Sequence, residues 1–306
     1  MGRRRWRGGA TLVAVTLVMA TGCTAVVSGS GSVVPGAVDK ASGARFDALY
    51  AKAVIPLFTG PSIDSHTKTF TLATYGDQKV LNGSDVIRIG SPPSIYEKSE
   101  VNRTGQNLDY IHISGQKLDY LLLGTLFKSV EPTPWVSYPT IYDGAEDHSG
   151  NCKLPGYAQI CTITDAIAHT GDVDHTLLRK VESNGAGGFK MTTGVSIATI
   201  LDTGVIGYTA PMKLSFTDDE RRVLLPTEID VDAQNRVTHL EINGALDANG
   251  TKRPAVAIQY GLTITFDVKA TDIPALPTAI DVTALPDAAA REAMYAKITA
   301  LRPQSK

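Results

Sequence analysis

Three cysteines in 306 residues are the whole thiol content of this chain, and the common catalytic and nucleotide-binding motifs are absent. The sequence has no G-x-S-x-G, H-E-x-x-H, P-loop or G-x-G-x-x-G pattern, and so no recognisable hydrolase, zinc-protease or nucleotide site. It also lacks a C-x-x-C redox pair and the further ligands that a zinc site needs. We therefore expect a protein that is not an enzyme and that holds no metal or other cofactor.

An excess of basic residues is missing as well. The chain has 29 lysines and arginines against 31 acidic residues, and its first 22 residues carry four arginines and no acidic residue. Cleavage after residue 22 would leave 25 basic residues and a net charge near −6. Such a chain has no electrostatic footprint for nucleic acid and no polybasic patch for anionic lipid. With 43% hydrophobic and 20% charged residues, the remainder is ordinary globular material.

The first 22 residues have the layout of a secretory signal. Arginines at positions 3, 4, 5 and 7 precede an apolar run over residues 10–20, which is too short to span a bilayer about 30 Å thick. The run leads into Ala20-Thr21-Gly22-Cys23, which resembles a bacterial lipobox, where a prolipoprotein is acylated on cysteine and cut before it. We expect lipidated Cys23 to anchor the protein to the outer face of the cytoplasmic membrane, because two or more acyl chains bind stably. The alternative is a soluble secreted protein with an accidental cysteine.

The other two cysteines have a separate explanation. Cys152 and Cys161 enclose eight residues, among them Pro155 and Gly156, which are able to make a turn. In the oxidising compartment that follows export, this spacing predicts a structural disulfide. In the chain-entropy model, closing a loop of this size contributes roughly 2–3 kcal/mol of stability.

Residues 24–42 are small, polar and rich in glycine and serine, which is typical of a flexible tether. Because no second linker follows, we expect one domain over residues 43–306.

Apolar residues at helical spacing predict three helices. The first covers residues 44–54 and stops before Pro56, and the last covers residues 288–301 and is capped by Asp287. A shorter helix is expected over residues 174–182.

Most of the remaining pattern indicates strands, because β-branched and aromatic residues alternate with polar ones between turn signals. The expected strands and hairpins cover residues 67–75, 108–124 with a turn at Ser114-Gly115, 133–144 with a break at Pro139, 187–200, and 226–244 with a turn over residues 232–235.

The clearest alternation runs over residues 256–268. The apolar members share one parity: Val256, Ile258, Tyr260, Leu262, Ile264, Phe266 and Val268. This run is longer than the usual strand of about 5–6 residues, and Gly261 at its midpoint would let it bend. It follows a turn at Asn249-Gly250 and predicts a curved antiparallel sheet with one apolar face. We therefore expect an α+β fold, a strongly curved half-barrel sheet wrapped around helices from both ends of the chain.

Three polar or aromatic groups were candidates for chemistry. DAIAHTGDVDH is the best metal candidate, with the ligands Asp165, His169, Asp172, Asp174 and His175. A turn at Gly171 followed by a helix cap explains the same residues, and we favour that interpretation. FTDDERR, residues 216–222, predicts an exposed turn with paired charges. Trp135 and Tyr138 face either a ligand cavity or a plain core.

Two further segments carry a family resemblance. Pro134-Trp135-Val136 follows a strand pair, and residues 229–242 form a strand, an Asp-containing turn and a strand. With the lipobox, the tether and the first helix, they resemble the actinobacterial LppX/LprA/LprF/LprG lipoproteins, which are distantly similar to the LolA and LolB carriers. The resemblance covers about residues 43–285. It implies a curved sheet on helices, an apolar cavity for acyl chains, and a carrier of lipids or glycolipids in the cell envelope.

Such a cavity would be lined from the first helix, the central hairpins and the long strand. The candidate lining residues are Phe46, Leu49, Tyr50, Leu121, Leu123, Trp135, Tyr138, Ile258, Tyr260, Leu262, Ile264 and Phe266.

Two segments depart from the family pattern. Residues 143–176, with the disulfide, look like an insertion, and the last helix looks like an addition, so either could fill or cover the cavity. The leading hypothesis is a lipid-anchored carrier of a lipid or glycolipid. The alternative is a structural or interaction lipoprotein with a filled core that docks another envelope protein. A third hypothesis, an envelope hydrolase, requires Asp165, His169 and His175 to converge.

Overall fold

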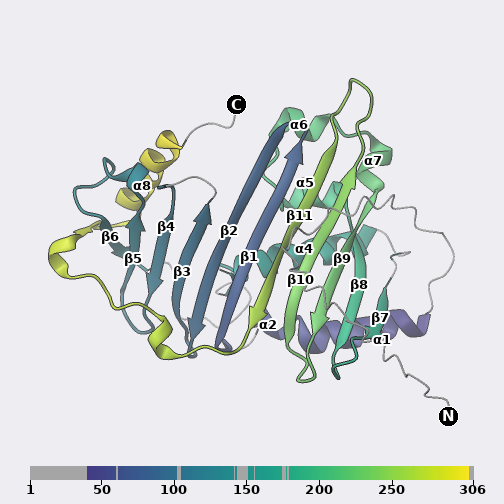
Figure 1. Ribbon diagram of the computed structural model, residues 1–306, viewed down its shortest axis with the longest axis horizontal. Coiled ribbons are helices and arrows are strands. Elements are labelled where there is room, and N and C mark those ends of the chain that lie inside the picture. The colour runs from purple at the N-terminus through teal and green to yellow at the C-terminus, as the bar shows by residue number, and fades with distance from the viewer. Residues whose placement is uncertain are drawn as a thin grey trace, which may run out of the picture.

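One open, curved sheet of twelve strands forms the body of the molecule (Figure 1). The computed structural model describes residues 40–59, 61–101, 105–140, 142, 151–154, 156–173, 177 and 179–302. The strands are β1 (Ser65–Tyr75), β2 (Gln78–Ile89), β3 (Ser94–Val101), β4 (Leu108–His112), β5 (Leu118–Leu123), β6 (Trp135–Pro139), β7 (Lys180–Ser183), β8 (Phe189–Ser196), β9 (Leu224–Val231), β10 (Val237–Leu246), β11 (Val256–Thr265) and β12 (Val282–Ala284). Neighbouring strands are antiparallel except β12 and β6, which are parallel.

Two meanders meet in the middle of this sheet. Strands β1 to β6 run outward from the centre, and strands β7 to β11 run from the opposite edge back to it. β11 then pairs with β1 along its whole length, from Thr265 opposite His66 to Val256 opposite Tyr75. The centre of the sheet therefore joins segments that are far apart in the sequence.

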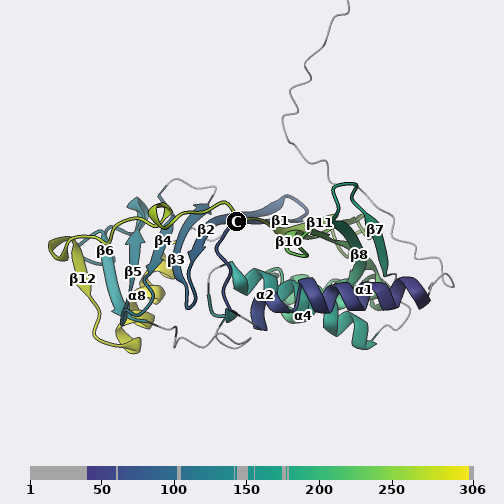
Figure 2. The same cartoon turned by 90° about the horizontal axis from the view of Figure 1, so that it is seen from below.

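The helices lie on one face of the sheet, which confirms the α+β class. They are α1 (Lys40–Ala53), α2 (Pro56–Thr59), α4 (Tyr157–Val173), α5 (Ile197–Thr203), α6 (Ala210–Leu214), α7 (Asp218–Arg222) and α8 (Ala288–Leu301). Figure 2 shows α1, α2 and α4 beneath the half formed by β7–β11, and α8 beneath the other half on the same side. We call this helix-covered side the concave face, and the opposite side the convex face. Buried side chains from α1 to α8 form one continuous hydrophobic cluster.

The predicted alternation in the long strand is confirmed over β11, although the strand ends three residues earlier than expected. Val256, Ile258, Tyr260, Leu262 and Ile264 are all buried on the concave face. At Gly261 a Cβ atom would lie 2.5 Å from the carbonyl oxygen of Leu240, so a side chain there would force the neighbouring strands apart.

Both terminal helices are confirmed. α1 begins at Lys40, so residues 40–42, which were expected in the tether, are helical. α8 has the predicted bounds, and the Asp287 carboxylate accepts a hydrogen bond of 2.9 Å from the Ala290 N–H at its first turn. Met294 and Ile298 of its apolar stripe are buried, whereas Tyr295 and Leu301 stay exposed.

The helix predicted over residues 174–182 is wrong. The helix of this region is α4, which ends at Val173, and β7 begins at Lys180. The helix lies earlier in the chain because buried apolar residues one and two turns apart, Ile160, Ile163 and Ile167, form a stripe within the segment that was expected to be an insertion. The turn expected at Gly171 is also wrong, because that residue lies within α4.

The predicted disulfide is confirmed. Cys152 and Cys161 are bonded, with their Cα atoms 5.9 Å apart, so the turn before α4 is tied to the helix itself.

The strand predicted over residues 187–200 is too long. β8 ends at Ser196, whose hydroxyl oxygen accepts a hydrogen bond of 3.1 Å from the Thr199 N–H and caps α5. β6 ends at Pro139, at the predicted break.

The segment FTDDERR is a helix rather than an exposed turn. Thr217 and Glu220 form a capping box at the start of α7. Glu220 also accepts hydrogen bonds from Nη2 and Nε of Arg253, at 2.7 and 3.1 Å, and the Arg253 side chain is only 1% exposed. Burial raises the pKa of Glu220, but the hydrogen bonds from Arg253 and Thr217 outweigh it and lower the pKa from 4.5 to about 2.

A long C-terminal segment crosses the convex face (Figure 2). We call residues 266–281, between β11 and β12, the strap. It contains the 3-10 turns η2 (Ala270–Asp272) and η3 (Ala279–Asp281). Its end is fixed by the pairing of β12 with β6 and by a hydrogen bond of 2.8 Å from the Leu285 N–H to the Ser137 carbonyl.

The predicted signal over residues 1–22, the lipidation site Cys23 and the tether up to residue 39 lie outside the described residues. Within the part of the chain that the structure describes, no helix is both long and apolar enough to cross a bilayer.

Candidate functional site

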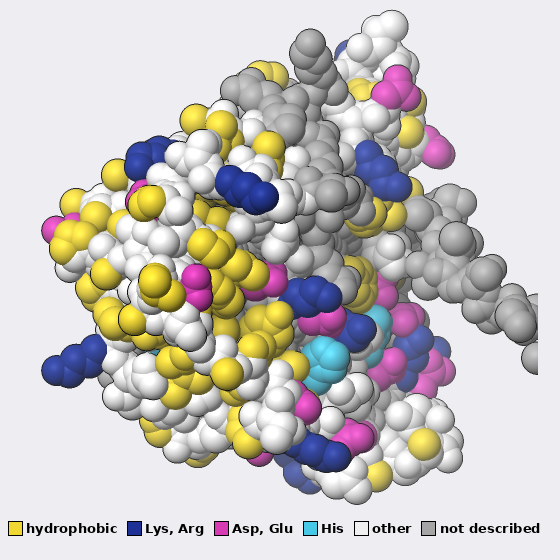
Figure 3. Space-filling model, turned by 60° about the vertical axis from the view of Figure 1, so that its left-hand side comes forward, with side chains coloured by type: hydrophobic (Ala, Val, Ile, Leu, Met, Phe, Trp, Pro, Cys, Tyr) yellow, Lys and Arg dark blue, Asp and Glu magenta, His cyan; other side chains and the backbone are white. Residues whose placement is uncertain are grey.

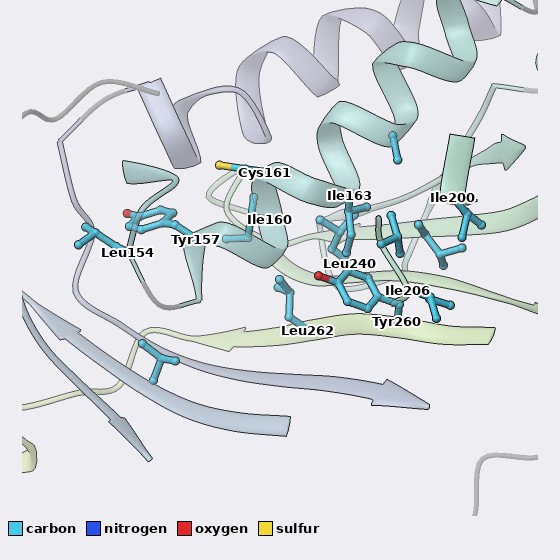
Figure 4. Close-up of a cluster of buried hydrophobic side chains, with 14 of the residues drawn as sticks. Leu154, Tyr157, Ile160, Cys161, Ile163, Ile200, Ile206, Leu240, Tyr260 and Leu262 are labelled. Carbon is cyan, nitrogen blue, oxygen red and sulfur yellow. The ribbon is translucent and has the colours of Figure 1, made fainter. Parts of the chain in front are cut away.

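One half of the concave face is apolar and covered by α4. Figure 4 shows Ile160 and Ile163 of this helix above Leu240, Tyr260 and Leu262 of the sheet. All five side chains are buried in the same hydrophobic cluster. The predicted insertion therefore supplies a helix that packs on the face where the sequence predicted a cavity.

The other half of the concave face, from β4 to β6, lies under α8. Leu121, Leu123 and Tyr138 are buried here, and the Tyr138 hydroxyl lies 3.4 Å from that of Tyr295 on α8. Burial and the neighbouring tyrosine raise the pKa of the Tyr138 phenol. The Arg291 guanidinium of α8 also stands 5.7 Å from the Tyr138 ring centre. This half combines aliphatic side chains with phenol groups.

The predicted candidates on α1 lie at the far edge of the molecule. Phe46 is buried, and its ring stacks on that of Tyr50 with 5.8 Å between centres. Leu49 is partly buried against the same cluster. An ion pair of 2.8 Å between Asp47 and Arg179 holds α1 beside β7. These residues lie in the half of the molecule that holds α1 and α4, whereas Leu121 and Tyr138 lie under α8, so the candidates are spread over both halves of the hydrophobic cluster.

Two other candidates lie away from both groups. Trp135 points to the convex face, because it is three residues from Tyr138 in the same strand and alternate residues point to opposite faces. Phe266 follows the end of β11 and lies partly buried beneath the Arg236 guanidinium, 3.9 Å from its ring centre.

A row of buried polar residues crosses the concave face from β1 to β6. Cross-strand pairing aligns Ser65 with Arg88, Arg88 with Ile95, Ile95 with His112, His112 with Asp119, and Asp119 with Tyr138. Each of these six residues is 3% exposed or less, and five of them are polar. We call them the polar row. Polar and charged groups are costly to bury, so the row is the part of the concave face that we consider as a candidate functional site.

Arg88 is the cation of the polar row. Its guanidinium lies 3.4 Å from the ring centre of Tyr157 at the start of α4, and it donates a hydrogen bond of 3.3 Å to the Ser65 hydroxyl. Burial lowers the pKa of Arg88, and the phenols of Tyr157 and Tyr142 act in the opposite direction. The first turn of α4 thus covers one end of the row.

His112 and Asp119 form a buried pair further along the row. The distance from His112 Nδ1 to Asp119 Oδ1 is 2.8 Å, and their side chains are almost fully buried. The Tyr142 ring meets the imidazole edge-on, with 5.5 Å between ring centres. The arrangement orients the imidazole in the way that a carboxylate orients the histidines of many binding and catalytic sites.

Next to the polar row lies a group of hydroxyls on β1 and β2. The hydroxyls of Thr69 and Ser84 are 2.9 Å apart, and the Ser84 N–H donates to Thr69 Oγ1 at 3.0 Å. Thr67 is 1% exposed, and its hydroxyl has no hydrogen-bond partner within the described structure. Nearby, burial raises the pKa of Glu97, and a hydrogen bond from Ser84 offsets part of this. These groups could bind a polar ligand atom.

The predicted metal candidates form no metal site among the residues that the structure describes. Asp165 and His169 lie one turn apart on the exposed side of α4, Asp172 is near its end, and residues 174 and 175 lie outside the described residues. Over the described ranges, no group of three His, Cys, Asp or Glu residues could hold a metal ion.

Sequence reasoning missed the polar row. Arg88, His112 and Asp119 are in three different strands, and only the register brings them together. One local signal in the sequence was available. Ser84 and Arg88 alternate with Val86 on one face of β2, and polar residues at such positions are unusual on a face that packs against the core.

Comparisons with known proteins give no family for this chain. No family model matches it, and no curated protein matches it. Among solved structures, the chain is similar to a DUF1329 family protein from Desulfovibrio piger, with 6% identity and a TM-score of 0.23, over 76% of this chain and 93% of that one.

Proposed function

We propose that this protein is an exported, lipid-anchored lipoprotein that binds an apolar or amphiphilic ligand on its concave face and carries it within the cell envelope. The ligand class is a lipid or glycolipid. The membrane contact is the acylated Cys23, and the direction of export follows from the signal over residues 1–22.

The observation that carries this proposal is the division of the concave face. The half beneath α8 buries aliphatic side chains, such as Leu121 and Leu123, next to the polar row of Arg88, His112 and Asp119. A ligand with a polar head and a hydrocarbon chain needs both kinds of surface side by side. A face that served only as a core would gain nothing from burying charged groups.

Ligand binding would be driven by burial of hydrocarbon, at about 0.8 kcal/mol for each methylene group. Release requires a second conformation with a lower affinity, because binding that is equally tight in every state moves nothing. α4 and α8 cover different halves of the sheet and come from separate parts of the chain, so displacement of either cover would supply such a second conformation.

The test is to purify the protein from its own host, and to identify non-covalent lipid by native mass spectrometry and extraction. Leu121→Trp, which enlarges a buried side chain under α8, should lower lipid occupancy. Leu118→Trp, in the same strand but 38% exposed, serves as its control. Near-UV circular dichroism checks the fold of both variants. The proposal fails if no lipid co-purifies and the uncharged probe N-phenyl-1-naphthylamine does not bind, or if both variants retain equal occupancy.

The second candidate function is an interaction lipoprotein with a filled core that docks another envelope protein. The packing of Ile160 and Ile163 onto the sheet favours it, because α4 occupies the half of the face where the long strand lies. This function predicts an empty protein that nevertheless retains a specific protein partner after cross-linking in cells.

A further inference from the structure

A pocket lies on the convex face, on the opposite side of the sheet from the helices. Its volume is about 360 Å³, and it opens where the strap crosses the ends of β2, β3 and β4. Ile89 pairs with Ser94 and follows Arg88, whose side chain faces α4, so Ile89 and Ser94 point away from the helices. This pocket is therefore separate from the concave site. Figure 3, in which the left-hand end of Figure 1 comes forward, shows hydrophobic side chains gathered over the part of the molecule that contains β4–β6 and the C-terminal segment.

The walls are aliphatic and incompletely buried. Ile89 is the last residue of β2, Ile113 directly follows β4, and Ile273 and Leu276 come from the strap. All four side chains are of intermediate exposure, although Ile111 in β4 is fully buried. The pocket thus holds apolar surface that the fold itself leaves uncovered, which is typical of a ligand site.

The strap is held in a defined shape above the pocket. The Lys269 N–H donates to the Asp272 carboxylate at 2.8 Å, and the Asp272 N–H donates to the Lys269 carbonyl at 2.9 Å. Pro274 follows in the pocket lining, where its ring restricts the backbone of the strap and its nitrogen carries no N–H group. Because β12 fixes the other end, the strap cannot simply collapse onto the sheet and close the pocket.

The polar groups of the pocket are few and uncharged. Ser94 and Gln116 are the two polar residues among its lining. The Ser94 hydroxyl oxygen accepts a hydrogen bond of 3.0 Å from the Ser114 N–H, so it is already engaged. Gln116 is exposed, and no hydrogen bond of its carboxamide is seen in the described part of the chain. One carboxamide at the mouth can donate to or accept from a neutral head group.

We propose that this pocket, which we call the strap pocket, binds an uncharged aliphatic ligand: one hydrocarbon chain with an alcohol, ester or amide head that hydrogen-bonds to Gln116. A pocket of this volume is within the range of about 300–1,000 Å³ that small-molecule sites occupy. An ionised head is disfavoured, because the lining has no opposite charge to compensate for its lost hydration. This site is additional to the concave one and does not depend on it.

The experiment uses the full chain with isoleucine methyl groups labelled for NMR, since Ile89, Ile113 and Ile273 report directly from the pocket walls. Octan-1-ol and octanoate are the probes, at pH 7. We expect octanol to shift these three methyl signals saturably, with an affinity at least about tenfold above that of octanoate. Gln116→Leu should weaken octanol binding about 2–10-fold.

Two strap variants complete the test. Ala275→Trp fills the pocket and should abolish the octanol shifts, whereas Ala279→Trp, four residues further along the strap and outside the pocket, should leave the affinity within about twofold. Ala270→Trp is a second filling variant if Ala275→Trp disturbs the remaining methyl spectrum. The proposal is overturned if the three signals do not shift saturably, if octanoate binds as tightly as octanol, or if the filling variants bind octanol like Ala279→Trp.

Discussion

Thr67 and Thr69 lie two residues apart on the same face of β1, and exchanging each for valine gives opposite predictions. Thr67→Val removes a hydroxyl that is buried without a partner, whereas Thr69→Val removes the partner of both the Ser84 hydroxyl and the Ser84 N–H. The two substitutions have the same shape and the same strand context. Any difference between them therefore reports the hydrogen bonds rather than packing.

The magnitudes follow from the cost of burying unpaired polar groups. An unpaired buried hydroxyl costs about 1–3 kcal/mol, so Thr67→Val should stabilise the ligand-free protein by at least about 1 kcal/mol. Thr69→Val removes the hydroxyl to which the Ser84 N–H donates, while the Ser84 hydroxyl keeps its hydrogen bond to Glu97, and should destabilise the protein by about 1–3 kcal/mol. If the Thr67 hydroxyl is kept for a polar atom of the ligand, Thr67→Val should also lower ligand occupancy while raising stability.

Urea unfolding of the delipidated protein, followed by near-UV circular dichroism, measures the free energy of unfolding of both variants. Native mass spectrometry of the same variants from the host measures occupancy. If Thr67→Val destabilises the protein as much as Thr69→Val does, the Thr67 hydroxyl is not an unpaired group and the reasoning fails. If occupancy is unchanged in Thr67→Val, the hydroxyl does not contact the ligand.

Four further predictions concern stability. The pKa of Glu220 is about 2 in the folded protein and 4.5 in the unfolded chain, so its contribution to stability is complete above pH 4.5 and is lost as the pH falls through 2. Acid titration of the unfolding free energy should show a loss of about 1–2 kcal/mol after solvent screening. Glu220→Gln should abolish this loss. Arg253→Met removes the cation that pairs with the Glu220 carboxylate and should lower the free energy of unfolding by about 3–5 kcal/mol in a urea melt. A loss below about 1 kcal/mol would contradict a structural role for the pair. The double change Cys152→Ser and Cys161→Ser should cost roughly 2–3 kcal/mol, and reducing agent should then have no further effect on the melting temperature. Asp287→Ala should cost about 1 kcal/mol through α8, and Asp287→Asn should restore it.

The elements that could be predicted from the sequence are those that are buried on one side and exposed to solvent on the other. β11 shows its alternation because the concave side is buried and the other side meets solvent, and α8 carries its own cap at Asp287. β4 shows no alternation in burial, since the strap crosses the convex face and Ile111 is buried there as well. α4 was not predicted because its apolar stripe lies among Cys161 and residues that can bind metal. These residues led to the interpretations of a disulfide-bearing insertion and a candidate metal site.

The candidate site was predictable only in its apolar part. Leu121 and Leu262 follow from local pattern, but the polar row requires the register of six strands, and register depends on every turn between them. The Arg253–Glu220 pair is hidden for the same reason, since 33 residues separate its members. The strap pocket is invisible in sequence because its walls come from hairpin ends and from a segment without regular structure.

The pairing of β1 with β11 has a consequence for how this chain folds. Each meander consists of neighbours that are close in sequence, but Thr265 follows His66 by 199 residues, so the two meanders join only when nearly the whole domain is available to fold. Loop-closure entropy makes such contacts late and slow. Until then β1 presents an unpaired edge of eleven residues, the kind of edge that pairs with other chains. Before β11 pairs with it, this edge is therefore the part of the chain most exposed to aggregation.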